Sequence, residues 1–331
     1  MKKIVAVLML VFVLFSFSSC AGSPTSEQSN ELPRMTVVTA PMGSGWYAST
    51  VLFSDIWMNN IEGLNVSVQE GGSIGNIRAV DEGIDANMGW AYTVDLADSF
   101  EGTGPFEKKT ENIRFIANTW PVWLNVVVLE ESGINSIEEL ASAKINVGAI
   151  NTGSEVAAKR LLEAYGLTYE NIKSNGGTVS YGSYSDASTQ LGDKIVQAMM
   201  GGGSPDIPAV HEVEVTKNIK LLPASEEALQ KIADLNLGYG IDLPLPANTY
   251  KGQTEDVPAV TYNGVMIVNK DVPDDVVYQL TKSIWENIDR FRQEQPARGN
   301  LMSLEHALDG FDVEKLHPGA ARYYKEKGIL D

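Results

Sequence analysis

Three short loops of glycine, serine, threonine and asparagine hold the residues best suited to bind a ligand. Each follows a β-rich run and precedes a helical pattern, and the three are Gly43-Ser44-Gly45, Gly72-Ser73 with Gly75-Asn76, and Thr152-Gly153-Ser154. The first turn of a helix has unpaired N–H groups and a partial positive charge, and glycine lets a ligand approach the backbone closely. Such loops bind a carboxylate or phosphate without a lysine or arginine. One loop alone is usually an ordinary N-capped helix start, but three in one chain favour a binding site.

Aromatic side chains gather near these loops. They are Trp46, Tyr47, Trp90, Tyr92, Trp120, Trp123, Tyr181 and Tyr184. Aromatic walls with a few polar groups are typical of small-ligand pockets, although each of these residues alone is more often part of the core. Tyr47 and Tyr92 are the best candidates, because each is close to a glycine loop or a strand end. Trp46 lies beside the first loop, whereas Trp123 begins a buried run and is expected in the core.

A run of three glycines, residues 201–203, follows an apolar segment and precedes Ser204-Pro205. Without side chains, this backbone could approach a ligand or another part of the protein closely. Gly203 and Ser204 are therefore further candidates for ligand contact. The alternative interpretation, a loose surface loop, is equally compatible with the sequence.

Hydrolytic chemistry is not supported. Residues 71–75 match the G-x-S-x-G pattern of a nucleophile elbow, but an α/β-hydrolase needs several strands and an oxyanion loop upstream of that serine. Too few residues precede Ser73 to supply them. The histidines His211, His306 and His317 occur in contexts that do not indicate catalysis. We therefore expect no catalytic residues and no enzymatic activity.

Metal and cofactor motifs are also absent from the sequence. It contains no H-E-x-x-H, no paired cysteines, no Walker loop and no dinucleotide fingerprint. Asp193, Asp206 and Asp242 are interpreted as surface aspartates in loops or at helix ends. We expect neither a metal nor a cofactor.

The N-terminus has the features of an export signal. Lys2 and Lys3 precede an apolar run that is too short to span a bilayer as a mature helix, and residues 1–19 are interpreted as a signal peptide. Cys20 is the only cysteine and follows small residues as in a lipobox, although Phe17 stands where an aliphatic residue is usual. We expect lipid attachment at Cys20, a flexible tether over residues 20–34, and a periplasmic or cell-surface location. The alternative is a plain cleaved signal with an incidental cysteine.

The composition excludes some partners. The formal net charge is −18, which argues against nucleic acid and anionic lipid surfaces as partners, leaving the N-terminal lipid as the expected link to a membrane. A hydrophobic content of 44% is that of an ordinary globular core. An anionic ligand would have to be held by local dipoles against this unfavourable overall field.

The elements that position the loops alternate between strand and helix, which predicts an α/β fold with mostly parallel sheets. The expected strands are residues 35–40, 65–70 and 144–150, and the expected helices are 46–59, 74–82 and 155–165. The apolar runs 123–129 and 261–268 read as fully buried strands. A helix over residues 274–295 is predicted from its apolar stripe.

We interpret the two apolar runs as crossings between two lobes. Lobe 1 would comprise residues 35–124 and 259–331, and lobe 2 residues 125–258. The alternative is two sequential domains divided near residue 130.

Several motifs together resemble those of the TAXI family, the extracytoplasmic solute-binding subunits of TRAP transporters. The motifs are Gly45-Trp46-Tyr47, residues 72–78, Asn151-Thr152-Gly153-Ser154-Glu155, residues 252–258 and the closing residues 316–324. The resemblance implies a two-lobed periplasmic-binding-protein type II fold that closes on a small organic acid or acidic amino acid such as glutamate. It also implies delivery to TRAP membrane permease subunits driven by an ion gradient.

By position, the resemblance places Gly45, Tyr47, Ser73, Asn76, Thr152, Gly153 and Ser154 in the cleft, and we add Ser44, Trp46, Gly72 and Tyr92 from the residues themselves. The chain departs from the family at Trp46, Asn87, Tyr92 and Thr93, all at the expected pocket wall. Two alternatives stay open, of which the first is opposed by the absence of a base–nucleophile pair and the second is favoured by the departures at Asn87 and Tyr92. One is an enzyme on the same fold, and the other is a surface lipoprotein with an adhesion or signalling role and no transport ligand.

Overall fold

The computed structural model describes residues 34–309 and 312–331. The expected signal peptide, the lipidation site at Cys20 and all but the last residue of the tether lie outside the described residues. Within the described part, no helix is both long enough and apolar enough to cross a membrane.

The described strands form one mixed sheet. They are β1 (Met35–Val38), β2 (Val66–Gln69), β3 (Met88–Tyr92), β4 (Ile113–Leu129), β5 (Lys144–Asn146), β6 (Thr178–Ser180), β7 (Ala198–Gly203), β8 (Ile219–Leu221) and β9 (Thr261–Asn269). Their order is β2-β1-β3-β9-β4-β7-β5-β6, with β8 paired to β4. The pairs among β1, β2 and β3 and among β5, β6 and β7 are parallel, whereas β9 and β4 are antiparallel to their neighbours.

Helices pack around this sheet. They are α1 (Gly45–Asn60), α2 (Ser73–Glu82), α3 (Thr93–Glu101), α4 (Gly153–Ala164), α5 (Tyr169–Ser174), α6 (Tyr184–Gly192), α7 (Pro208–Glu214), α8 (Glu226–Ala233), α9 (Asp274–Glu286), α10 (Ile288–Glu294), α11 (Pro296–Gly299) and α12 (Pro318–Glu326). Short 3₁₀ turns occupy Glu130–Ser132, Glu138–Ser142 and Val313–Lys315.

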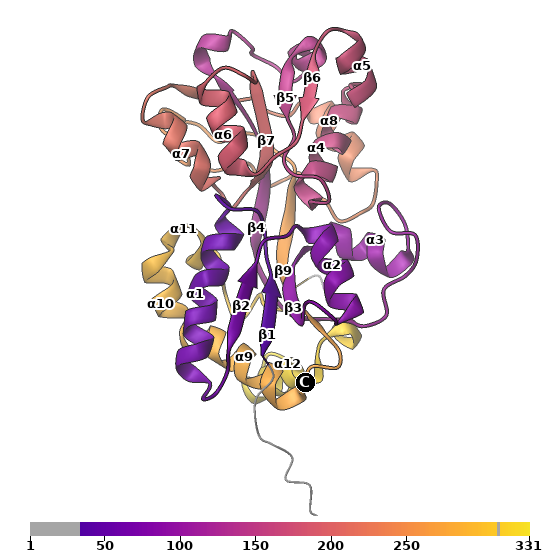
Figure 1. The fold of residues 1–331 in the computed structure, drawn as a ribbon, viewed down its shortest axis with the longest axis vertical. Coiled ribbons are helices and arrows are strands. Elements are labelled where there is room, and N and C mark those ends of the chain that lie inside the picture. Colours follow the sequence, from indigo (N-terminus) through magenta and orange to yellow (C-terminus); the bar gives the residue numbers. More distant parts are fainter. Residues whose placement is uncertain (1–33, 310–311) are drawn as a thin grey trace, which may run out of the picture. The chain divides into compact units, whose positions relative to one another are not determined.

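Two long strands join two lobes of the folded body. Figure 1 shows β4 and β9 running side by side between a lower lobe with β1 to β3 and an upper lobe with β5 to β7. We call these lobe 1 and lobe 2. Both apolar runs predicted as buried strands are strands, and the two-lobed α/β fold is confirmed. The lobe boundaries at residues 124/125 and 258/259 remain a proposal.

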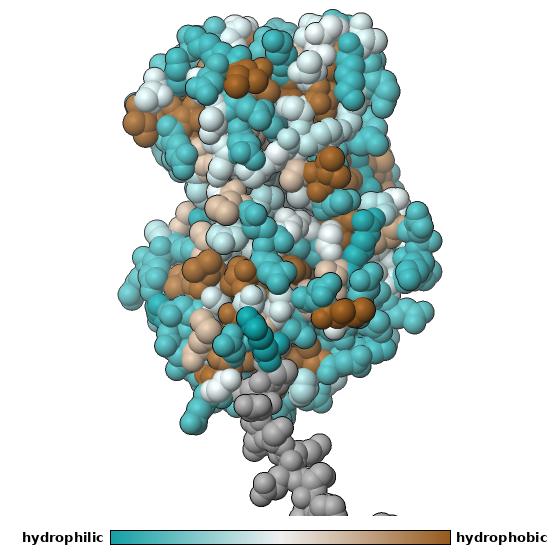
Figure 2. All heavy atoms as spheres, viewed as in Figure 1, coloured by the Kyte–Doolittle hydropathy of each residue, from teal (hydrophilic) through white to brown (hydrophobic). Residues whose placement is uncertain are grey.

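Hydrophilic side chains dominate the visible surface, and aromatic side chains fill the interior of lobe 1. Figure 2 shows a visible face that is mainly hydrophilic, with scattered hydrophobic residues. Inside lobe 1, Trp57, Trp90 and Trp120 are almost fully buried, and Phe291 stacks between Phe53 and Trp120. This aromatic core supports α1, whose N-terminus carries the first glycine loop.

Two predicted elements differ from the structure, and the question left open for residues 201–203 is answered. The strand expected over residues 144–150 ends at Asn146. The helix expected over residues 274–295 is divided into α9 and α10 at Asn287, whose backbone leaves the helical region (φ −113°, ψ 16°). The glycine run 201–203 is not a loose loop but the end of β7, paired with β4 through Asn125 and Trp123. Glycine is needed there because a Cβ on Gly201 would lie 2.6 Å from the Tyr184 ring.

Candidate ligand-binding site

Each of the three loops begins a helix. Ser44 is the N-cap of α1 and its Oγ accepts a hydrogen bond from the backbone N–H of Tyr47 (3.2 Å). Thr152 caps α4 in the same way through Glu155 (3.3 Å). Gly72 is the N-cap of α2 and has no side chain to cap it. The first turns of three helices are thereby directed to one region, which can stabilise a negative charge.

The three loops meet around a cavity of about 20 Å³. Its lining is Ala40, Pro41, Ser44, Gly45, Trp46, Gly72, Ser73, Tyr92, Thr152, Ser154, Tyr184, Gly202 and Ser204. The structure therefore brings together nine of the predicted contact residues, from both lobes. Tyr184 and Gly202 were not among those candidates, although the aromatic cluster and the glycine run both pointed to this area.

Four predicted contact residues do not line the cavity. Tyr47 is half-buried on α1, and Gly203 packs against Asn125 and the backbone that follows it. Gly153 is covered by side chains from lobe 1. Asn76 has a structural role, because its amide donates to the carbonyls of Thr39 (2.6 Å) and Trp90 (2.8 Å) and accepts from Gly72 N–H (3.1 Å).

The two lobes are in direct contact around the cavity. Asp98 of α3 pairs with Arg160 of α4 (2.9 Å), and Asn151 accepts a hydrogen bond at its carbonyl from Gly75 N–H (3.4 Å). A cavity of about 20 Å³ holds about one water molecule. A larger ligand can therefore bind only if the lobes separate and the side chains between them move.

Aromatic rings fill most of the space between the loops. Trp46 lies 4.4 Å from Tyr92 between ring centroids, and Tyr92 lies 4.5 Å from Tyr262. The Tyr92 ring reaches lobe 2, where it packs on Gly153, and its hydroxyl approaches Gly202. These side chains are the ones that would have to move to admit a ligand.

Several buried polar groups at this interface have no hydrogen-bond partner among the described residues. They are both carboxyl oxygens of Asp95, Nε of Arg298, Nε1 of Trp46 and the hydroxyl of Tyr262. Such groups are costly in a protein interior and are rare without a reason. Those of Asp95 and Trp46 belong to residues that lie in or beside the lining of the cavity.

Asp95 is the most unusual of these groups. It lies in the first turn of α3 with 0% of its surface exposed. Burial raises its pKa from 3.8 to about 7, against the lowering influence of Ser73 and Arg160. Asp95 could not be predicted from the sequence, because nothing there distinguishes it from the many acidic residues that are exposed.

Arg298 was also missed from the sequence, and it corrects the interpretation of Asp206 as a surface aspartate. Arg298 belongs to the four-residue helix α11 and packs against Gly45 at the start of α1. Its Nη2 pairs with Asp206 Oδ1 of lobe 2 at 3.0 Å, with both side chains largely buried. A cation therefore lies beside one of the glycine loops, which the sequence reading did not expect.

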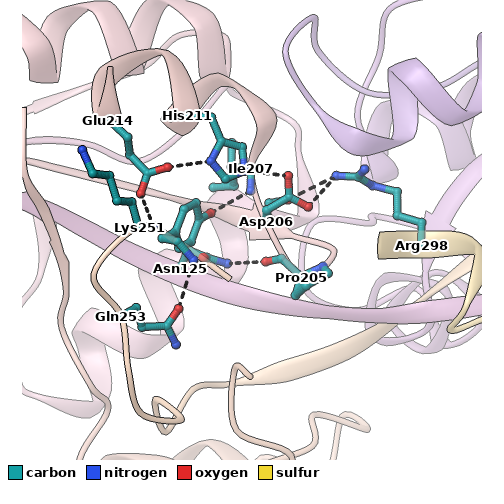
Figure 3. A network of polar contacts seen from close by, with 10 residues as sticks. Asn125, Pro205, Asp206, Ile207, His211, Glu214, Lys251, Gln253 and Arg298 are labelled. Atoms are coloured by element: carbon teal, nitrogen blue, oxygen red, sulfur yellow. Dashed lines mark hydrogen bonds and ion pairs between the residues drawn. The ribbon is translucent and has the colours of Figure 1, made fainter. Parts of the chain in front are cut away.

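Asp206 is held by a wider network (Figure 3). His211 contacts Asp206 through Nε2 (3.2 Å) and Glu214 through Nδ1 (2.6 Å), and Glu214 accepts from the backbone N–H of Lys251 (2.7 Å). The hydrogen bond to Asp206 raises the pKa of His211 to about 9. Burial alone would raise the pKa of Asp206, but His211 and Arg298 lower it overall, so the Asp206 carboxylate is ionised at neutral pH.

Removing this interlobe pair should favour separated lobes. Asp206→Asn is expected to weaken closure by about 2 kcal/mol, the usual contribution of a hydrogen bond to a charged group. Small-angle X-ray scattering of the unliganded protein should show a larger radius of gyration. Asp193→Asn, at an exposed position, is the control. An unchanged radius of gyration for Asp206→Asn would show that the pair does not hold the lobes together.

Comparison with known proteins agrees with this architecture. A structure described as a periplasmic transporter aligns with a TM-score of 0.53 at 11% identity, covering 90% of this chain and 94% of that chain. A protein assigned as an L-cystine ABC transporter from Listeria monocytogenes aligns with a TM-score of 0.50 at 12% identity, covering 82% and 99% respectively. At these identities the likeness shows the fold alone. Residues 37–328 match the model of the NMT1-like family.

Proposed function

Because the chain belongs to the NMT1-like family, we propose that it is a solute-binding protein that captures a small carboxylate ligand between its lobes for delivery to a membrane transporter. The observation that carries this proposal is the convergence of three helix N-termini from two lobes on one cavity. Helix N-termini favour anions, and a site shared by two lobes couples binding to closure.

The carboxylate of the ligand would bind at the N-termini of these three helices. In lobe 1, Ser44 and Ser73 offer hydroxyl groups beside unpaired N–H groups, and Thr152 and Ser154 do the same in lobe 2. Tyr184 connects two lining residues of lobe 2, because its hydroxyl donates to Ser154 Oγ (2.9 Å) and accepts from Gly202 N–H (2.7 Å). A ligand that touches both lobes binds the closed state more tightly than the open one, and this difference drives closure.

The motif resemblance extends the proposal to the transporter. The motifs shared with the TAXI family favour delivery to TRAP permease subunits, and the family ligands favour an acidic amino acid such as glutamate or an organic acid. Export and lipid attachment at Cys20 belong to the same proposal. The structural relatives share the two-lobed fold that this proposal requires.

A thermal-shift assay tests the carboxylate requirement. A ligand at about 100 times its dissociation constant adds roughly 2.7 kcal/mol to the stability of the folded state, which should raise the melting temperature by several degrees. The panel is glutamate, pyroglutamate and 2-oxo acids, and 2-pyrrolidinone is the control because it is the pyroglutamate ring without its carboxylate. The expected result is a shift with at least one acid and none with the control. No shift with any acid contradicts the proposal.

The small cavity favours a second candidate function. With about 20 Å³ between the closed lobes, the protein could be a surface lipoprotein with an adhesion or signalling role and no transport ligand. In that case Trp46 and Tyr92 would be permanent core residues of a filled cleft. The same thermal-shift panel separates the two functions, because a filled cleft responds to none of the acids.

A further inference from the structure

Asp95 is a buried acid that the proposed carboxylate site does not use. Its carboxyl group lies between α3 of lobe 1 and the first residue of α4 in lobe 2, where a Cβ on Gly153 would overlap Oδ2. Neither oxygen has a well-formed hydrogen bond among the residues that the structure describes, and the Ser73 hydroxyl, which lowers the pKa of the carboxyl group, is a nearby donor. A carboxyl group can accept several hydrogen bonds, and leaving all of them unmade in the interior is costly.

The group is next to the cavity. Ser73, which lines the cavity, is close enough to lower the pKa of Asp95, and its Oγ accepts from Tyr92 N–H (2.9 Å), which leaves the hydroxyl proton available. On the lobe 2 side, Gly153 stands between the lining residues Thr152 and Ser154. The Tyr92 ring packs on the same face of Gly153 and belongs to the lining. Movement of Tyr92 would therefore extend the cavity toward Asp95.

Within residues 34–309 and 312–331, no cation pairs with Asp95. Arg160 contributes a favourable field, but its guanidinium donates to Asp98 Oδ2 (2.9 Å) and to the Tyr239 hydroxyl (2.9 Å). Asp98 is thus the paired acid of α3, and Asp95, one turn earlier, is the unpaired one. The rings of Trp46, Tyr92 and Tyr262 form a continuous aromatic cluster on the cavity side, and aromatic faces attract cations.

We propose that Asp95 is the subsite for an ammonium group of the ligand, so that the solute is an α-amino acid rather than a simple organic acid. This inference rests on the proposed function, since the ligand's carboxylate would be held by the helix N-termini while its ammonium group donates to Asp95. An ammonium group offers three donors, which matches a carboxylate with free acceptors.

Matched pairs of ligands test the subsite. Isothermal titration calorimetry would compare L-glutamate with 2-oxoglutarate and L-leucine with 4-methyl-2-oxopentanoate, since each pair shares a carbon skeleton and differs in the amino group. For at least one pair, the amino acid should bind at least about ten-fold more tightly, as expected for a charge-assisted hydrogen bond. Asp95→Asn should remove that advantage and change the affinity for the 2-oxo acid by less than about three-fold.

Asp98→Asn is the matched control on the same helix. Because Asp98 joins the lobes through Arg160, its loss should weaken both members of a pair, while the amino acid keeps its advantage over the 2-oxo acid. The subsite is overturned if the 2-oxo acid binds as tightly as the amino acid, or if Asp95→Asn weakens both equally, and in those cases the carboxylate site still stands. If no member of either pair binds and no acid of the thermal-shift panel raises the melting temperature, the proposed function itself fails and the subsite fails with it.

Discussion

Gly153→Ala is expected to prevent tight ligand binding while leaving the folded protein as stable as before. A Cβ at this position would overlap Asp95 Oδ2 and the Tyr92 ring. Even after Tyr92 moves to admit a ligand, the contact with Asp95 would keep α3 and α4 from closing on it. Overpacking of this kind usually costs about 1 to 3 kcal/mol, which corresponds to a loss of affinity of roughly 5- to 150-fold. Alanine is also a better helix former than glycine, so α4 itself should not be weakened.

Two measurements separate closure from folding. Calorimetry gives the affinity for the best acid of the panel, and thermal unfolding without ligand gives the stability. Gly75→Ala is the matched control, because this glycine also lies in the first turn of a helix beside the cavity and nothing lies within 4 Å of its added Cβ. If Gly153→Ala binds the acid as tightly as Gly75→Ala does, Gly153 and Asp95 do not approach each other in the ligand-bound protein.

Asp95→Asn is expected to stabilise the protein above neutral pH. The unfolded chain ionises Asp95 near pH 3.8 and the folded protein near pH 7, so the folded state binds more protons between these values. Stability therefore falls as the pH rises from about 4 to 7. Since one pKa unit corresponds to about 1.4 kcal/mol, the ionised side chain costs about 4 kcal/mol in the folded protein at pH 8.

The asparagine variant has no proton to lose, so it avoids this cost. Its melting temperature relative to the parent protein should be higher at pH 8 than at pH 4 by roughly 5–10 °C. The groups that act on Asp95 are Ser73 and Arg160, which lower its pKa, and Asp98, which raises it. Exposed Asp193→Asn should show no such pH dependence. The same difference at both pH values for Asp95→Asn would mean that the buried carboxyl group is already solvated or paired.

The fold could be predicted because local signals agreed along most of the chain. Glycine and hydroxyl residues marked the helix starts at Ser44, Gly72 and Thr152, and each of them is an N-cap. The two apolar runs predicted the central strands β4 and β9. The glycine run 201–203 was ambiguous, since only tertiary contacts with Tyr184 and β4 determine that it is a strand.

The polar part of the site could be predicted only in part. Nine predicted contact residues line the cavity because they lie at element ends, which the sequence marks. Asp95 and Arg298 lie in contexts that look like ordinary solvated helix positions, and only packing buries them. Nothing local distinguishes Asp95 from Asp98, yet one is unpaired and the other is bound to Arg160.

The route of the chain through the two lobes has a mechanical consequence. The described chain begins in β1 and ends after α12, both in lobe 1, and lobe 2 is linked to it chiefly by β4 and β9 (Figure 1). Any attachment upstream of β1 therefore restrains lobe 1 directly, whereas lobe 2 can still rotate relative to lobe 1. A permease that distinguishes the liganded from the unliganded protein would then have to recognise the orientation of lobe 2 relative to lobe 1. The surface of lobe 2 is the part whose position would differ between the two states.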